Sequence, residues 1–395
     1  MLSFDYYAPT YVVFGSGREA EVGALVRRFG GTRVMLVYGG KSAKESGLID
    51  RVEGYLREAG LACETYGGVQ PNPRVAHMRE GIRRALAFGA DFLLGVGGGS
   101  AMDTAKAIAH GAANPELDIW DDIWMNPSCL KKSLPVGVIS TLPASGSEMS
   151  DSAVTTNEEL GTKRGLTTDL NRPKFAILNP ELAATLPPYQ VACGAVDILS
   201  HTLERYFNPE NSNDLTDELA EGLMRTVIRH AAAAVAVPHD AHALSELTWC
   251  SSLSHNNLTG LGGVKDFAVH QFGQQLGASF DAAHGATLSV MWPCWARYCL
   301  SVDPARFARY GEKVWELAPT EDATEDGKRA IGITEEFFRS LHMPTCFTEL
   351  GVGVQSEESL RALAHGVSRG GTRTIGKFRV LDEEDMLAIF RLANH

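Results

Sequence analysis

The sequence is poor in cysteine, and its cysteines are not paired. Only 7 of the 395 residues are cysteines, an odd number, and no two of them form a C-x-x-C pair. This pattern excludes a disulfide framework and a zinc ribbon, and scattered free cysteines are typical of the reducing cytosol. We therefore expect a cytoplasmic protein.

Positive charge is also scarce. Lys and Arg together number 36 against 48 Asp and Glu, which gives a formal net charge of −12. A field of this sign repels nucleic-acid phosphates and anionic lipid head groups, and no run of Lys and Arg is long enough to form a basic patch. We expect neither nucleic acids nor membranes as partners.

Long apolar runs are missing as well. No window holds about 18 consecutive apolar residues, and the N-terminus has no basic segment followed by an apolar one. Hydrophobic residues nevertheless make up 44% of the chain and charged residues 21%, which are ordinary values for a globular protein. The length suffices for two domains with separate cores. We expect a soluble, untargeted, two-domain protein.

The first half of the chain alternates short apolar segments with amphipathic ones. Four segments are apolar at consecutive positions, which is typical of parallel strands that are covered on both faces. These segments are residues 34–38, 92–96, 136–139 and 175–178. Between them lie helical patterns such as 48–60 and 75–89, each closed by a glycine suited to a left-handed C-cap. The alternation predicts an α/β nucleotide-binding domain over residues 1–186.

The second half of the chain has a different texture. After about residue 180 strand signals disappear, and long helical periods run through residues 191–207, 215–237 and 245–257. The Leu186-Pro187-Pro188 step marks a boundary, because proline terminates the preceding element and can open the next helix. We expect an all-helical domain over residues 187–395, with any active site in the cleft between the two domains.

A glycine-rich loop, Gly95-Val-Gly-Gly-Gly-Ser100, directly follows a predicted strand and begins a predicted helix. In this setting, backbone N–H groups and the helix dipole can hold a diphosphate. Ser100 and Asp103 also resemble a capping box, so these residues could simply begin a helix. Three consecutive glycines between strand and helix favour phosphate binding, although the loop matches neither G-x-G-x-x-G nor the P-loop motif.

Two further loops follow predicted strands. Residues 140–148 carry hydroxyls and a glycine that suit a nucleotide's base or ribose, but such a loop can equally satisfy its own hydroxyls. Residues 38–42, Tyr-Gly-Gly-Lys-Ser, lack the acidic residue that commonly accepts the 2′-hydroxyl of an adenosine ribose. A donor-rich turn with Lys41 favours NADPH over NADH, unless Lys41 is a solvated surface lysine or Glu45 weakens its effect.

Histidines and one carboxylate in the second half form a candidate metal site. Asp197 and His201 are four residues apart on a predicted helix and share one face, whereas His270 and His284 are fourteen apart. Neither spacing matches the H-E-x-x-H motif or a zinc finger. Asp197 and His201, together with Glu204, could also be the polar stripe of an amphipathic helix, so spacing alone does not decide.

Taken in order, these motifs resemble the iron-containing, metal-dependent alcohol dehydrogenases, over essentially the whole chain. Residues 38–42 and 266–270 look most like the butanol dehydrogenase and NADPH-dependent aldehyde reductase branch. The resemblance implies a fold similar to dehydroquinate synthase, with a Rossmann-like dinucleotide-binding domain and an all-α metal-binding domain. The motifs that carry the resemblance are Gly97-Gly-Gly-Ser100-x-x-Asp103-x-x-Lys106, Thr141-Leu-Pro-Ala-Ser-Gly-Ser-Glu148, Leu186-Pro-Pro, Asp197-x-x-x-His201, His270…His284-Gly285 and Gly376-Lys-Phe-Arg-Val.

The resemblance also implies which residues form the site. The metal, Fe²⁺ or Zn²⁺, would be held by Asp197, His201, His270 and His284. The cofactor would be contacted by Gly39, Gly40, Lys41, Ser42, Gly97, Gly98, Gly99, Ser100, Asp103, Thr141, Leu142, Ser147 and Lys163. Many family members carry a further histidine four residues after the third ligand. This chain has Gln274 there, which can hydrogen-bond or position a water but cannot relay a proton as a histidine does.

The activity that the resemblance implies is hydride transfer between NADPH and a small aldehyde or primary alcohol, with the metal polarising the oxygen. A lyase or a polyol or polyol-phosphate dehydrogenase of the same fold is one alternative. It would need basic residues to hold an anionic substrate, and no Arg/Lys cluster accompanies the predicted ligands. A non-catalytic nucleotide-binding protein is the other alternative, for which the glycine loop alone would suffice.

The segment 4–14, rich in Tyr and Val, predicts an edge strand. Such an edge is a template for pairing with a second copy of the chain, and members of the resembled family commonly dimerise there. We expect a homodimer or a larger homo-oligomer.

Overall fold

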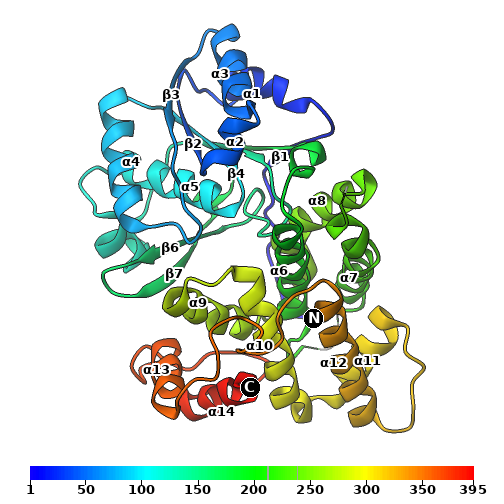
Figure 1. Cartoon of the computed structure of the whole chain (residues 1–395). Coiled ribbons are helices and arrows are strands. Elements are labelled where there is room, and N and C mark those ends of the chain that lie inside the picture. The colour runs from blue at the N-terminus through cyan, green and yellow to red at the C-terminus, as the bar shows by residue number, and fades with distance from the viewer. Residues whose placement is uncertain (211–212, 238) are drawn as a thin grey trace. The chain divides into compact units, whose positions relative to one another are not determined.

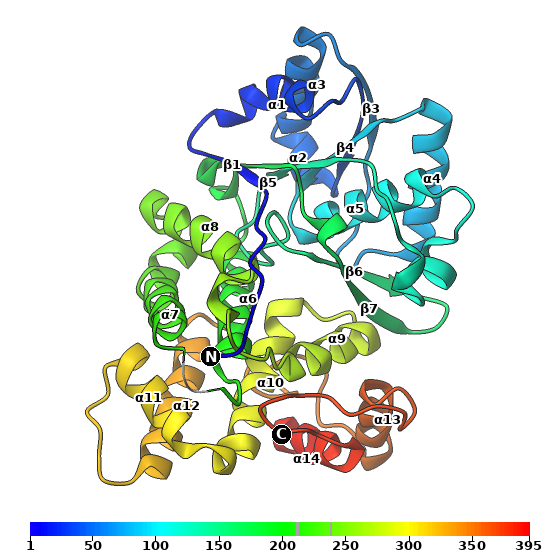
Figure 2. The ribbon, with the colours of Figure 1, turned by 180° about the vertical axis from the view of Figure 1, so that it is seen from behind.

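The computed structural model describes residues 1–210, 213–237 and 239–395, without the side chains of residues 41 and 42 (Figures 1 and 2). The chain forms two compact units, Tyr7–Leu186 and Pro187–His395, and the latter also includes Met1–Tyr6. The N–H of Leu2 donates a hydrogen bond to the backbone oxygen of Gly262 at 2.9 Å, which ties the first residues to the second unit. An α/β unit and a mostly helical unit confirm the predicted fold class.

A six-stranded sheet, parallel throughout, forms the centre of the first unit. Its strand order is β1-β8-β5-β4-β2-β3. The strands are β1 (Tyr11–Phe14), β2 (Arg33–Tyr38), β3 (Ala62–Tyr66), β4 (Phe92–Gly97), β5 (Val136–Ser140) and β8 (Phe175–Leu178). The four strands predicted from apolar runs are confirmed as β2, β4, β5 and β8.

Helices cover both faces of this sheet, which explains the consecutive apolar residues. In β2, Val34 and Leu36 join a buried cluster with the helices on one face of the sheet, whereas Met35 and Val37 join a cluster with the helices on the other face. The helices of this unit are α1 (Val22–Arg28), α2 (Lys41–Glu45), α3 (Leu48–Glu58), α4 (Val75–Phe88) and α5 (Gly99–Ala113). Gly89 ends α4 at a φ of 69°, the left-handed cap that the sequence predicts.

Two features of the first unit differ from the prediction. The edge strand β1 covers only Tyr11–Phe14, so the expectation of a strand from residue 4 was wrong for residues 4–10. An antiparallel pair, β6 (Ser152–Asn157) and β7 (Thr162–Thr167), lies outside the main sheet. The sequence does not predict β6, because two of its buried positions, Thr155 and Asn157, are polar, so the strand has no apolar run.

The second unit is helical. Its helices are α6 (Pro188–Tyr206), α7 (Asp214–Val235), α8 (Ala241–His255), α9 (Ala268–Phe280), α10 (His284–Cys299), α11 (Pro304–Trp315), α12 (Ala323–Ser340), α13 (Glu357–Val367) and α14 (Glu383–Ala393). Figure 1 shows α6 in the middle of this unit, and it packs against α7, α8, α9 and α10. Pro188 lies in its first turn, as the double proline predicts. In the described ranges, no helix is both long and apolar enough to cross a membrane.

The backbone of α10 approaches that of α6 closely at Gly285. A methyl group on Gly285 would lie 2.2 Å from the backbone oxygen of Cys193 in α6. Backbone atoms cannot move aside as a flexible side chain can, so only glycine fits here. Because His284 directly precedes Gly285, this contact also fixes the place of His284 relative to α6.

We expect Gly285→Ala to lower the free energy of unfolding by about 1–3 kcal/mol, because the added methyl group forces the two helices apart. Gly332 in α12 provides a matched control, since a methyl group there meets nothing within 4 Å. Alanine favours a helix over glycine by up to about 1 kcal/mol, so Gly332→Ala should be as stable as the parent or more so. Denaturant-induced unfolding of both variants measures the difference, and equal stability would contradict the close approach.

Candidate metal and cofactor sites

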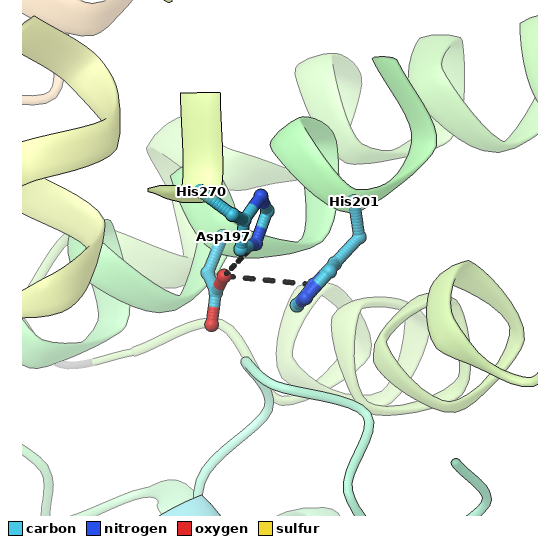
Figure 3. A group of neighbouring side chains, drawn as sticks. All are labelled: Asp197, His201 and His270. Atoms are coloured by element: carbon cyan, nitrogen blue, oxygen red, sulfur yellow. Dashed lines mark ion pairs between the residues drawn. The ribbon is translucent and has the colours of Figure 1, made fainter. Parts of the chain in front are cut away.

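Helices α6 and α9 bring three potential ligand atoms together. Asp197 and His201 lie one turn apart on α6, and His270 lies in the first turn of α9 (Figure 3). One ligand atom from each side chain lies within 4.8 Å of the other two. Nδ1 of His201 is 3.5 Å from Oδ1 of Asp197, and Nε2 of His270 is 3.7 Å from the same oxygen. All three side chains are buried.

His284 reaches the same carboxylate from a third helix. It is the first residue of α10, and its Nε2 is 3.7 Å from Oδ1 of Asp197. Its ring centroid lies 5.3 Å from that of His270. With 28% of its side chain exposed, it is the most accessible of the four. The structure therefore brings all four predicted residues together around one carboxylate oxygen.

The donor atoms of this cluster fit a divalent cation. Oδ1 of Asp197, Nδ1 of His201 and Nε2 of His270 are buried and have no hydrogen-bond partner among the described residues. Buried polar atoms without a partner are costly, and a cation would satisfy all three at once. Imidazole nitrogen and carboxylate oxygen are ligands that Fe²⁺ and Zn²⁺ both accept.

The two buried imidazoles differ in protonation. Burial, together with the neighbouring imidazoles of His255 and His270, lowers the pKa of His201 well below its usual value, so its ring is neutral. Burial also lowers the pKa of His270, but the carboxylates of Glu204 and Asp197 outweigh burial and raise it to about 9. A metal at this position would therefore displace a proton from His270.

Two residues beside the ligands are not among the predicted site residues. Glu204, further along the same face of α6, is buried and pairs with Nδ1 of His270. His255 ends α8 and packs edge-on against His201, with ring centroids 4.1 Å apart. Glu204 could have been predicted from the sequence, because it belongs to the polar stripe of α6. No spacing in the sequence indicates His255. Gln274 lies half-buried on α9, one turn after His270.

The glycine-rich loop connects β4 to α5. Gly97 ends the strand at a φ of 149°, a conformation that favours glycine, and Gly98 is the N-cap of a helix that begins at Gly99. No side chain caps this helix. Asp103 instead accepts hydrogen bonds from Oγ of Ser147 at 2.6 Å and from the N–H of Val154 at 2.9 Å. The capping-box interpretation of Ser100 and Asp103 was therefore wrong.

The loops after β2 and β4 lie at the point where the sheet reverses its winding direction. β3 and β4 flank β2 on opposite sides, and open parallel sheets bind ligands outside the carboxyl ends of strands at such a point. Gly39 and Gly40 directly follow β2, and a methyl group on Gly97 would lie 3.9 Å from the backbone nitrogen of Gly39. The side chains of Lys41 and Ser42 lie outside the described residues.

The loop after β5 packs on the glycine loop. The N–H of Thr141 donates to the backbone oxygen of Gly97 at 3.1 Å, and Leu142 lies over Gly98. These contacts bring the predicted residues of the two loops side by side. Lys163 lies on β7, where its Nζ donates to Oδ1 of Asn72 at 2.8 Å.

Buried Lys106 fixes this loop to α5. Its Nζ donates to the backbone oxygen and to Oγ of Ser147 and to the backbone oxygen of Ser152, each at 2.8 Å. Burial lowers the pKa of Lys106 to about 8, although neighbouring Asp103 opposes this effect. Both charged side chains of α5 therefore hold Ser147 in place.

Comparison with known proteins identifies the family of the chain. The model of the iron-containing alcohol dehydrogenases matches residues 9–180. The model of the C-terminal part of the Fe-containing alcohol dehydrogenase family matches residues 191–394. Together the two matches cover nearly the whole chain.

Similar proteins agree with this result along their full lengths. The chain is 38% identical to NADH-dependent butanol dehydrogenase A of Clostridium acetobutylicum, over 99% of each chain. It is 32% identical to the NADPH-dependent aldehyde reductase YqhD of Escherichia coli, over 94% of this chain and 95% of that one. The crystal structure of NADH-dependent butanol dehydrogenase A from Thermotoga maritima matches with a TM-score of 0.95 and 32% identity, covering 100% of this chain and 99% of the other. The chain belongs to the iron-containing alcohol dehydrogenase family.

Proposed function

We propose that the chain is a metal-dependent NAD(P)(H) alcohol dehydrogenase that interconverts a small aldehyde and a primary alcohol. The observation that carries the proposal is the convergence of Asp197, His201, His270 and His284 on one buried oxygen. Family membership supports the reaction class. The butanol dehydrogenases and the aldehyde reductase among its relatives support small aldehydes and alcohols as substrates.

The residues of the cluster have distinct parts in this proposal. When bound, the metal supplies Lewis acidity toward the substrate oxygen, and the nicotinamide supplies or accepts the hydride. Asp197 contributes the negative charge and the three histidines contribute neutral nitrogens, which leaves a net charge of about +1 with a divalent ion. Such a site would favour negative charge on the substrate oxygen without a protein general base, and Gln274, a neutral amide, cannot supply one. We assign Fe²⁺ or Zn²⁺ to the site, and the family description favours iron.

For the cofactor, we propose that the glycine loop, Gly97 to Ser100, holds the diphosphate and that Asp103 lies at the nicotinamide ribose. Thr141, Leu142 and Ser147 would line the cofactor, and Lys163 would reach its phosphate or ribose. The packing of the two loops on each other and the position of β2 and β4 in the sheet support this assignment. The turn after β2 would hold the adenosine ribose and its 2′ substituent.

We also propose a cytoplasmic location. All seven cysteines are free, and four of them are buried, as in proteins of reducing compartments.

We expect His270→Ala to lose bound metal and reductase activity together. Loss of a Lewis acid that supplies several kcal/mol predicts a fall in kcat/KM of about 10³-fold or more. Elemental analysis of anaerobically purified protein measures the metal, and the absorbance of the reduced nicotinamide with short-chain aldehydes measures activity. His365→Ala is the control, because the side chain of His365 is 63% exposed and its ring pairs with Glu383, which is not a predicted ligand. Retained activity in metal-free His270→Ala protein would overturn the proposal.

We expect NADPH to bind at least about 10-fold more tightly than NADH, the effect of one charge-assisted hydrogen bond to the 2′-phosphate. This preference is expected because no acidic residue follows β2 to accept the 2′-hydroxyl of NADH. Gly39 has room for a side chain, since a methyl group there would lie 3.8 Å from its nearest neighbour. Gly39→Asp should therefore reverse the preference. Fluorescence titration with both nucleotides measures it, and tighter binding of NADH by the unaltered protein would refute the assignment.

We propose a homodimer or larger assembly that pairs through β1. The side chains of Tyr11 and Phe14 in this edge strand are exposed. The N–H groups of Tyr11 and Gly15 donate to the β8 side. Because successive N–H groups of a strand point to opposite sides, the N–H group of Val12 faces the open edge. Light scattering should give at least twice the chain mass of 42.7 kDa. Val12→Pro should dissociate the assembly, because it removes an edge donor and leaves the β8 ladder intact, whereas Val12→Ala should not. A monomer at micromolar concentration would contradict this.

A further inference from the structure

Glu204 joins α6 to the start of α9 through its carboxylate and its backbone oxygen. The carboxylate has no exposed surface. Its Oε2 pairs with Nδ1 of His270, and its Oε1 accepts from the N–H groups of Val269 at 2.5 Å and His270 at 3.2 Å. The backbone oxygen of Glu204 accepts from the N–H of Asp266 at 2.9 Å. Every one of these contacts goes to the five residues that end in His270.

Helix α9 is capped locally only at its first N–H group, that of Ala268, which donates to Oδ1 of Asp266 at 2.9 Å. Its N-cap residue, Phe267, has a φ of 57° and an apolar side chain that cannot accept a hydrogen bond. The N–H groups of Val269 and His270 are the second and third of the helix, which a capping side chain normally satisfies. Glu204 supplies this cap from another helix, and the positive end of the α9 dipole favours its negative charge.

The same carboxylate determines which nitrogen of His270 is available. An ionised carboxylate only accepts hydrogen bonds, so Nδ1 of His270 must carry a hydrogen. In the neutral ring, Nε2 then keeps its lone pair, and this atom is the one that faces Asp197 at 3.7 Å. Asp197, His201 and Glu204 occupy positions i, i+4 and i+7 of α6, which lie on one face. Two of them present ligand atoms, and the third orients a ligand on the neighbouring helix.

We infer that Glu204 is a positioning residue of the metal site, which sets the orientation and tautomer of His270 so that Nε2 binds the cation. The inference rests on the proposed function, since it requires that the cluster holds a divalent metal. It extends that function to a residue that contacts neither the metal nor the substrate. Partners of this kind typically change metal affinity by about 10–100-fold.

Glu204→Gln tests the inference at almost constant side-chain volume. The amide oxygen can still cap α9, but the amide N–H₂ then faces Nδ1 of His270 and favours the tautomer with hydrogen on Nε2. We expect Zn²⁺ to bind about 10–100-fold more weakly, measured on the apoprotein by competition with a chromophoric chelator. Should this variant fail to fold, Glu204→Asp replaces it, because a carboxylate one methylene shorter falls away from Nδ1, with the same direction expected.

Glu221→Gln is the matched control. Glu221 is equally buried in the same unit, and its carboxylate binds the hydroxyl of Tyr206 and the guanidinium of Arg309 instead of a predicted ligand. This variant should lose stability but keep its Zn²⁺ affinity. Unchanged affinity in the Glu204 variant, or an equal loss in both variants, would overturn the positioning role. Failure of the unaltered protein to bind Zn²⁺ or Fe²⁺ would instead overturn the proposed function, so the two failures are distinguishable.

Discussion

The burial of one carboxylate among imidazoles is the constraint on which the second unit depends. Asp197 is only 4% exposed, and an ionised carboxylate in such a place must be balanced by positive charge. The structure offers two ways to supply it. One is the proton that Glu204 and Asp197 hold on His270, whose pKa they raise to about 9, and the other is a divalent cation.

The helices are arranged to keep this cluster together. Helix α6 carries two of the four side chains, and α9 and α10 each bring one to it. Gly285 lets α10 approach the backbone of α6, and Glu204 attaches α9 to α6 by capping its first turn. In the first unit, Lys106 and Asp103 of α5 hold the loop after β5 in a similar way, through hydrogen bonds to Ser147. Each site therefore depends on buried polar contacts as well as on apolar packing.

Local patterns in the sequence predict much of the fold. The strands β2, β4, β5 and β8 are readable because both faces are covered, which requires consecutive apolar residues. The pair β6 and β7 has no such run. Whether Asp103 forms a capping box with Ser100 cannot be read from the sequence, because its actual partners, Ser147 and Val154, are distant in the chain. Only the family resemblance predicts the full ligand set, because residue spacing within α6 says nothing about His270, which lies on another helix. The cap that Glu204 provides is likewise invisible, as capping rules consider only neighbours in the chain.

The most direct test of the central claim is anomalous X-ray scattering from crystals of anaerobically purified protein, recorded on either side of the iron and zinc absorption edges. A single anomalous peak bonded to Asp197, His201, His270 and His284 is the expected result, with Nε2 as the bonding atom of His270. No peak at this cluster, or a peak bonded to other residues, would contradict the assignment.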